Sequence, residues 1–331
     1  SAVPWMVLVL GALAARAPVE PLHLVSERLA PDLALAAVML AWLPAARAWF
    51  DRRRYFVATA ALLVPLALAT PQLTPPMYGD EPFHLALMES LAEDRDLDLS
   101  DDLDLEHHPQ NALYAPGWPL FHSPGLGLLL LPGFLAAGRT GALVVLALMG
   151  GVLVKLAARR ARELDVGEDR IRFVMLAMVA TYPLATFASQ IWPELPGALA
   201  VAALLVLAGK RDGGRIRAAV VAAGAAVVKT RLALLTFPVM AVVWLRRNRL
   251  RGAALFAVAA AAVMAAGWLV MGHPFGPYRR LHHLWPSDSG LAGRVVGGLA
   301  FDAAGGLVFT APLLLVAAAG AVTLWRRGGT G

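Results

Sequence analysis

Long apolar runs separated by short charged clusters dominate the chain. The runs show no strand-like alternation, and most are close to the length that crosses a bilayer core of about 30 Å. Apart from one Pro- and Gly-rich run treated separately below, we interpret them as about ten membrane spans. These segments lie at roughly 3–15, 31–49, 55–74, 140–157, 171–188, 195–209, 216–229, 232–245, 252–271 and 305–325. The pattern therefore predicts an all-α fold, a polytopic transmembrane helical bundle.

Composition supports a membrane protein and excludes several other classes. Of the 331 residues, 59% are hydrophobic and only 16% are charged, with a mean hydropathy of +0.63. So few charges do not cover the surface of a soluble enzyme of this length, and the apolar content excludes a disordered chain. The absence of Cys excludes a disulfide scaffold, a thiol nucleophile and a thiolate metal site.

The basic residues indicate orientation rather than nucleic-acid binding. The net charge is +6 and the pI about 10.1, but most Lys and Arg lie at the ends of apolar segments. The clusters are at 47–54, 155–172, 210–217, 246–251 and 326–327. They share one side of the membrane if the N-terminus is cytoplasmic and each predicted span crosses once. We therefore expect an integral membrane protein that lies in the bilayer and does not bind nucleic acid.

Two segments need separate interpretation. Residues 119–137 are apolar but rich in Pro and Gly, and a crossing there would move the 155–172 cluster outside. We predict that this run lies along the outer interface. The first apolar run is either a span or a signal peptide, since Ala15-Arg16-Ala17 is loosely cleavage-like but no basic residue precedes the run.

The predicted organisation is one membrane domain without a soluble domain. Residues 1–54 form the N-terminal spans, and residues 55–331 form the remaining membrane domain. Two outer loops, about 75–139 and 272–304, carry most of the polar residues on the outer side.

The first outer loop carries the strongest candidates for chemistry. Between Pro76 and Ala115 there are eleven Asp and Glu residues and one basic residue. Asp80 and Glu81 directly follow a predicted span, and Pro82 suits the first turn of a new helix. A helix N-terminus favours ionised carboxylates, so this pair can provide a base or metal ligands at the interface. The alternative is simple helix capping.

Further polar residues fall on the same outer side in this topology. They are His84, His122, Gln190, Glu194, Lys229, Arg231, Arg279, Arg280 and Asp302. Lys229 and Arg231 are cations on the side where positive charge is scarce, which favours an anionic partner there. The alternative for these two is that they extend toward lipid phosphate at the outer leaflet.

The order of these motifs resembles a known family. Tyr78-Gly79-Asp80-Glu81-Pro82 is followed by a His-Ser-Pro-Gly run at 122–125 and a Gln-x-x-Pro-Glu-x-Pro turn at 190–196. A Lys-x-Arg pair at 229–231 and an Asp-x-x-x-Gly-Leu-x-Phe segment at 302–309 complete the series. Over about residues 55–325 the chain resembles the polytopic GT-C class of membrane glycosyltransferases. The similar branch contains protein O-mannosyltransferase-like and aminoarabinose-transferase-like membrane enzymes of bacteria. The resemblance therefore implies a bacterial inner or plasma membrane as the location.

The resemblance implies transfer of a sugar from a polyprenyl-phosphate-linked donor to an unidentified acceptor on the outer face, with inversion. It implies that Asp80 is the catalytic carboxylate with Glu81 as its neighbour, and that Lys229 and Arg231 hold the donor phosphate. No cofactor is certain. A divalent cation is left open, with Asp80, Glu81, His84 and Glu194 as candidate ligands.

Two other functions remain open from the sequence. A transporter or flippase of a lipid-linked or anionic substrate predicts charges within the spans and broken helices there. The polar candidates lie mainly at span ends, which favours the transferase. The third hypothesis is a non-catalytic subunit of a membrane complex, with a membrane-protein partner.

Overall fold

A computed structural model describes the central part of the chain. The described residues are 41, 43–44, 46–50, 52–73, 81–97, 99, 122–180, 184–208, 214–229, 232–245 and 249–271. They contain helices and no strand, which confirms the predicted all-α fold for this part of the chain. In sequence order the helices are α3 (Tyr55–Leu73), α4 (Glu81–Glu93), α5 (Gly125–Glu163), α6 (Glu168–Ala180), α7 (Leu184–Ala188), α8 (Glu194–Ala208), α9 (Gly214–Val228), α10 (Ala233–Leu245) and α11 (Arg249–Met271).

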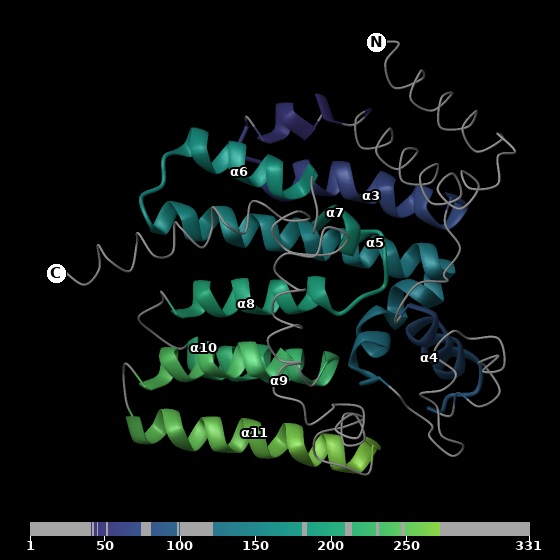
Figure 1. Cartoon of the computed structure of the whole chain (residues 1–331), viewed down its shortest axis with the longest axis vertical. Coiled ribbons are helices and arrows are strands. Elements are labelled where there is room, and N and C mark those ends of the chain that lie inside the picture. Colours follow the sequence, from purple (N-terminus) through teal and green to yellow (C-terminus); the bar gives the residue numbers. More distant parts are fainter. Residues whose placement is uncertain are drawn as a thin grey trace, which may run out of the picture. The chain divides into compact units, whose positions relative to one another are not determined.

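Helices α3 and α8 to α11 coincide with predicted apolar segments within a few residues. Helix α5 extends beyond the predicted span 140–157 at both ends, and the predicted span 171–188 corresponds to two helices, α6 and α7. Figure 1 shows α3 beside α5, and α8 to α11 stacked as successive layers, in agreement with the helix pairs that pack together. Helix α5 is the one helix in the described ranges that is long and apolar enough to cross a membrane. Apolar stretches of α3, α8, α9 and α11 are shorter. The first two predicted spans lie largely, and the last entirely, outside the described residues.

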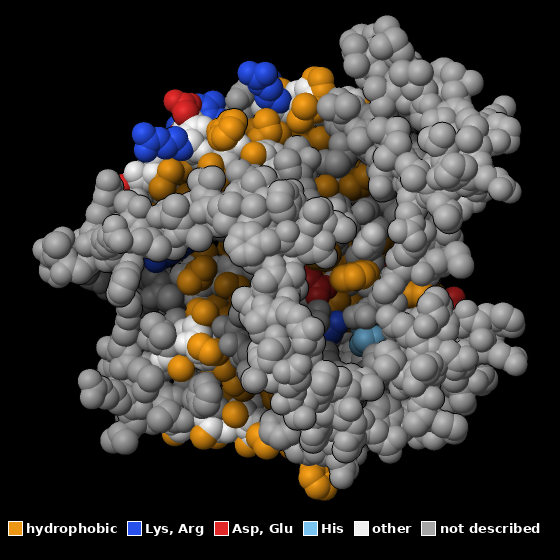
Figure 2. All heavy atoms as spheres, in the orientation of Figure 1, with side chains coloured by type: hydrophobic (Ala, Val, Ile, Leu, Met, Phe, Trp, Pro, Cys, Tyr) orange, Lys and Arg blue, Asp and Glu red, His pale blue; other side chains and the backbone are white. Residues whose placement is uncertain are grey.

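Large apolar side chains also reach the surface of these helices. Phe173, Ile216 and Leu269 are 73%, 70% and 84% exposed. Figure 2 shows hydrophobic side chains reaching the surface over several parts of the visible face. Exposed apolar surface on this scale is unusual for a protein surrounded by water and suits contact with lipid.

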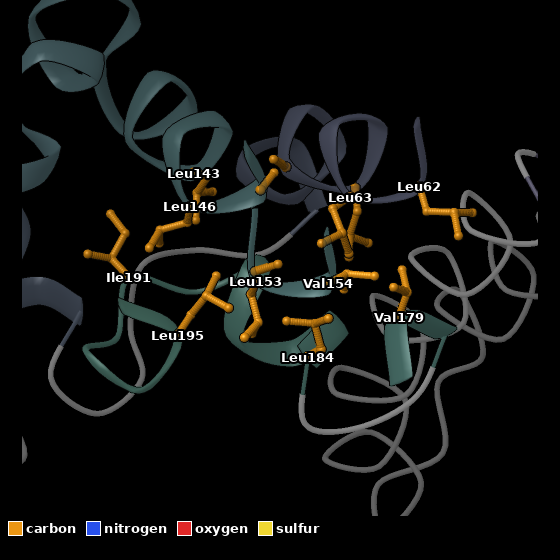
Figure 3. Close-up of a cluster of buried hydrophobic side chains, with 14 of the residues drawn as sticks. Leu62, Leu63, Leu143, Leu146, Leu153, Val154, Val179, Leu184, Ile191 and Leu195 are labelled. Carbon is orange, nitrogen blue, oxygen red and sulfur yellow. The ribbon is translucent and has the colours of Figure 1, made fainter. Parts of the chain in front are cut away.

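The hydrophobic core lies between α3, α5 and the segment from α6 to α8. Leu63 of α3 and Leu146 of α5 are fully buried there, together with Ile191 from the connection between α7 and α8 (Figure 3). Gly150 permits this packing, because a Cβ on it would lie 2.8 Å from a Leu63 methyl carbon. The core thus fixes α5 against the elements that carry several predicted site residues.

Helix α5 is broken at the end of the run that we predicted to lie along the outer interface. Ala137 has φ −157° and ψ 31°, and Gly138 has φ 57° and ψ −144°, a positive φ that favours glycine. Across the break, a Cβ on Gly141 would lie 1.9 Å from the carbonyl oxygen of Gly133. The chain therefore changes direction at 137–138, and the segment 139–163 alone is long enough to cross about 30 Å of hydrocarbon. Placement of the first segment along a membrane surface stays a prediction.

At the far end of α5, a charged network joins α5, α6 and the start of α3. Arg162 of α5 forms an ion pair with Glu168 at 2.8 Å, and the Tyr55 hydroxyl donates a hydrogen bond to the same carboxylate. These contacts, with the hydrogen bond from Arg162 as the largest cause, lower the pKa of Glu168 to about 2. This end of α5 belongs to the basic cluster that we predict on the cytoplasmic side.

Candidate functional site

The candidate site begins at the first residue of α4. Helix α4 starts at Glu81 with Pro82 in its first turn, as the sequence predicted. Proline suits this position because its ring fixes a helical φ and its missing N–H has no partner in the first turn. Glu81 and His84, three residues apart on one helical face, are 2% and 1% exposed. The start of α4 is therefore buried in the protein, with a carboxylate and an imidazole in its first turn and a half.

Arg139 binds the Glu81 carboxylate with two hydrogen bonds. Its Nε donates to Oε1 at 3.0 Å and its Nη2 donates to Oε2 at 3.3 Å. The two side chains are 12% and 3% exposed. Arg139 follows the break at 137–138 directly, so the bend in α5 turns this guanidinium toward α4. A paired, bidentate geometry is what a buried carboxylate requires to remain ionised.

A third element also contacts Glu81. The backbone of Ile191, in the connection between α7 and α8, hydrogen-bonds the carboxylate. Burial raises the pKa of Glu81 above its ordinary value, while Arg139 and this backbone contact lower it. Glu81 therefore joins the start of α4, the bend of α5 and the 190–194 turn.

Histidines from two segments meet beside this ion pair. The rings of His84 and His122 lie with centroids 5.4 Å apart, and Phe83 lies at the same distance from His122. His122 precedes the first turn of α5. The first outer loop thus folds so that two of its four histidines, 38 residues apart in sequence, lie in contact.

The first turn of α5 lies against both α4 and the end of α9. A Cβ on Gly127 would lie 2.8 Å from a Leu87 methyl carbon of α4. A Cβ on Gly125 would lie 2.4 Å from the carbonyl oxygen of Val227, two residues before Lys229. These two glycines allow the close approach, and larger residues there would separate α5 from its neighbours.

Lys229 lies at the end of α9 and is buried. It is 4% exposed, and its carbonyl accepts a hydrogen bond from Leu232 N–H at 2.8 Å. A lysine that extends along the surface toward lipid phosphate would leave its ammonium group exposed. Burial of Lys229 therefore favours a site within the protein over the lipid-contact alternative.

The 190–194 turn contributes further polar groups. Glu194 is the first residue of α8, and Gln190 lies at the other end of the turn. Between them, the indole N–H of Trp192 is buried and has no hydrogen-bond partner within the described ranges. A buried donor of this kind is available to a ligand oxygen. Figure 2 shows acidic, basic and histidine side chains near one another on the visible face, with hydrophobic side chains beside them.

The structure places most, but not all, of the predicted site residues. Glu81 and His84 share the start of α4, where Glu81 binds Arg139 of α5 and the His84 ring contacts His122. Gly125, in the first turn of α5, packs against the end of α9 close to Lys229. Asp80, Arg231, Arg279, Arg280 and Asp302 lie outside the described residues. Among the residues described, no group of three or more His, Asp and Glu side chains is arranged to hold a metal ion. The candidate metal ligands other than Asp80 thus do not form such a group by themselves.

Sequence reasoning missed Arg139 and Trp192. Arg139 could have been found by the argument applied to Lys229, because it is also a cation on the predicted outer side of the membrane, where positive charge is scarce. Trp192 carried no comparable signal, because a tryptophan near a predicted membrane interface is expected there in any case.

Comparisons with known proteins found no relative of this chain. The chain matches no protein-family model, and no curated protein or solved structure matches it.

Proposed function

We propose that the protein is a membrane glycosyltransferase of the GT-C type. It moves a sugar from a polyprenyl-phosphate-linked donor to an acceptor hydroxyl on the outer face of the membrane, within a bundle of about ten spans. The acceptor oxygen attacks the anomeric carbon, and the bond from that carbon to the phosphate oxygen breaks. The proton of the hydroxyl passes to a carboxylate, and polyprenyl phosphate leaves as an anion.

The observation that carries the proposal is the meeting of distant polar segments at one end of the helices. The Glu81–Arg139 ion pair, the Ile191 contact and the His84–His122 contact bring together residues that the sequence placed on one side of the membrane. These contacts gather polar groups from α4, α5 and the 190–194 turn inside the protein, where fixed hydrogen-bonding groups stabilise developing charge more strongly than they do in water.

The geometry of Glu81 supports a positioning role for this acid. Both Glu81 oxygens accept hydrogen bonds from Arg139, so this carboxylate is committed to holding α4 against α5. We assign Glu81 as a positioning residue and Asp80, its neighbour in the chain, as the base. Lys229 is assigned to the donor phosphate, and the Trp192 indole N–H to an oxygen of the donor.

The direct test is release of polyprenyl phosphate by the purified full chain. The chain would be placed in vesicles with a panel of polyprenyl-phosphate sugars and a membrane extract as the source of acceptors. Cleavage of one donor, with the label appearing in an acceptor, supports the transferase. Movement of an intact donor across the bilayer would instead identify a transporter. Neither activity with any donor would favour a non-catalytic subunit.

Lys229→Met is expected to weaken use of the donor without unfolding the protein. Removal of a group that stabilises charge developing on the leaving phosphate costs about 10²-fold in turnover. Initial rates at several donor concentrations measure the effect, and Arg217→Met serves as control because Arg217 is an exposed cation on the same helix. Equal rates for the two variants would remove Lys229 from the donor site.

The orientation is tested with single cysteines, since the chain has none of its own. Asp94→Cys, at the end of α4, is expected to react with a membrane-impermeant maleimide in intact cells. Asp165→Cys, in the turn after α5, is expected to react only after permeabilisation. Both aspartates are exposed, so accessibility within the protein does not bias the comparison. Labelling of both from the same side would show that the segment 139–163 does not cross the membrane.

A further inference from the structure

A cavity of about 530 Å³ lies at the basic end of α5, away from the proposed active site. Its lining comprises Phe56, Val152, Lys155, Leu156, Arg159 and Arg162. The five α5 residues recur at helical spacing and therefore form one stripe on the helix. Phe56 closes the apolar side from α3, where Gly151 allows its ring to approach α5 closely.

The lining contains an apolar part and a cationic part, and the cationic residues dominate toward the end of α5, although Lys155 lies between the two aliphatic residues. Val152 and Leu156 lie on the side nearer the middle of the helix, and Arg159 and Arg162 lie in its last turns. Among the described residues that line the cavity there is no carboxylate. An occupant that matches both parts has an anionic group at one end and a hydrocarbon chain at the other.

The positive charge of the cavity is only partly neutralised by neighbouring acids. Arg159 pairs with Glu163 at 3.0 Å, and Arg162 pairs with Glu168 at 2.8 Å. Within the described ranges, Lys155 is exposed and forms no ion pair. A cation near the membrane surface attracts anionic lipid head groups, with a contribution of about fivefold in affinity for each Lys or Arg.

We propose that this cavity binds an anionic glycerophospholipid. Its phosphate lies among Lys155, Arg159 and Arg162, and an acyl chain lies along Val152, Leu156 and Phe56. The proposal rests on a membrane location of the chain and not on the transfer reaction, because none of these residues belongs to the proposed active site. The lipid proposed here is therefore a different molecule from the lipid-linked sugar donor, and it binds at a different site.

The test compares lipids on the purified full chain in a neutral detergent, with native mass spectrometry as the measurement. Phosphatidylglycerol is expected to be retained in preference to phosphatidylcholine. Lys155→Gln is expected to weaken retention of phosphatidylglycerol about fivefold. Arg170→Gln, which removes an exposed cation of α6 outside the cavity, is expected to leave retention unchanged.

Two further measurements test the apolar part of the cavity and the need for an acyl chain. Val152→Trp is expected to reduce retention by filling the apolar part, and its folding is checked by its thermal unfolding temperature. Glycerol phosphate, which has the head-group charge but no acyl chain, is expected not to compete with the lipid. The proposal is wrong if the two lipids are retained equally, if Lys155→Gln behaves like Arg170→Gln, or if glycerol phosphate competes fully. Because these measurements involve no sugar donor, their failure leaves the transferase proposal untouched.

Discussion

Replacement of Asp80 by Asn is expected to lower sugar transfer by 10²- to 10⁴-fold, the range that a positioned general base contributes. The substitution preserves the shape of the side chain and removes its ability to accept the proton of the acceptor hydroxyl. Glu81 does not replace it, because Arg139 occupies both oxygens of that carboxylate. The rate of polyprenyl phosphate release is the measurement.

The matched control for Asp80→Asn is Glu93→Gln. Glu93 is an exposed carboxylate at the end of α4, so the control makes the same change from acid to amide outside the proposed site. It is expected to retain full turnover. If Asp80→Asn also turns over at the wild-type rate, Asp80 is not the base and the assignment fails.

Arg139→Met is expected to destabilise the protein by about 3–5 kcal/mol, because it leaves the buried Glu81 carboxylate without its cation. The effect is measured as the change in free energy of unfolding, with chemical denaturation in detergent. Arg160→Met removes a partly exposed arginine that pairs with Glu163 on the same helix. That control is expected to cost less than about 1 kcal/mol.

A double variant separates loss of the ion pair from loss of packing. Glu81→Leu combined with Arg139→Met replaces both charges with apolar groups, so no buried charge remains unpaired. We expect it to recover most of the stability lost by Arg139→Met alone. A double variant that is less stable than Arg139→Met would mean that Glu81 does not depend on Arg139 for its burial.

Local signals in the sequence were sufficient for the helices and for several candidate residues. The start of α4 was predictable because Pro82 marks a first turn, and the limits of α8 to α11 follow from apolar runs bounded by charge. The break at 137–138 was predictable as the end of a Pro- and Gly-rich run. The sequence near Glu81 did not indicate that Arg139 is its partner, because the ion pair between these two residues depends on how α5 bends.

The sequence by itself determined an all-helical fold in the described part of the chain, because hydrophobic length and charge placement are properties of consecutive residues. It predicted about ten spans, and the described ranges contain one helix that is long and apolar enough to cross a membrane. The tertiary structure decided which of the outer polar residues meet. It paired Glu81 with Arg139, brought His84 to His122 and buried Lys229, because glycines at 125 and 127 allow α5 to approach α4 and α9. Such contacts depend on packing between segments far apart in the chain, and no local pattern encodes them.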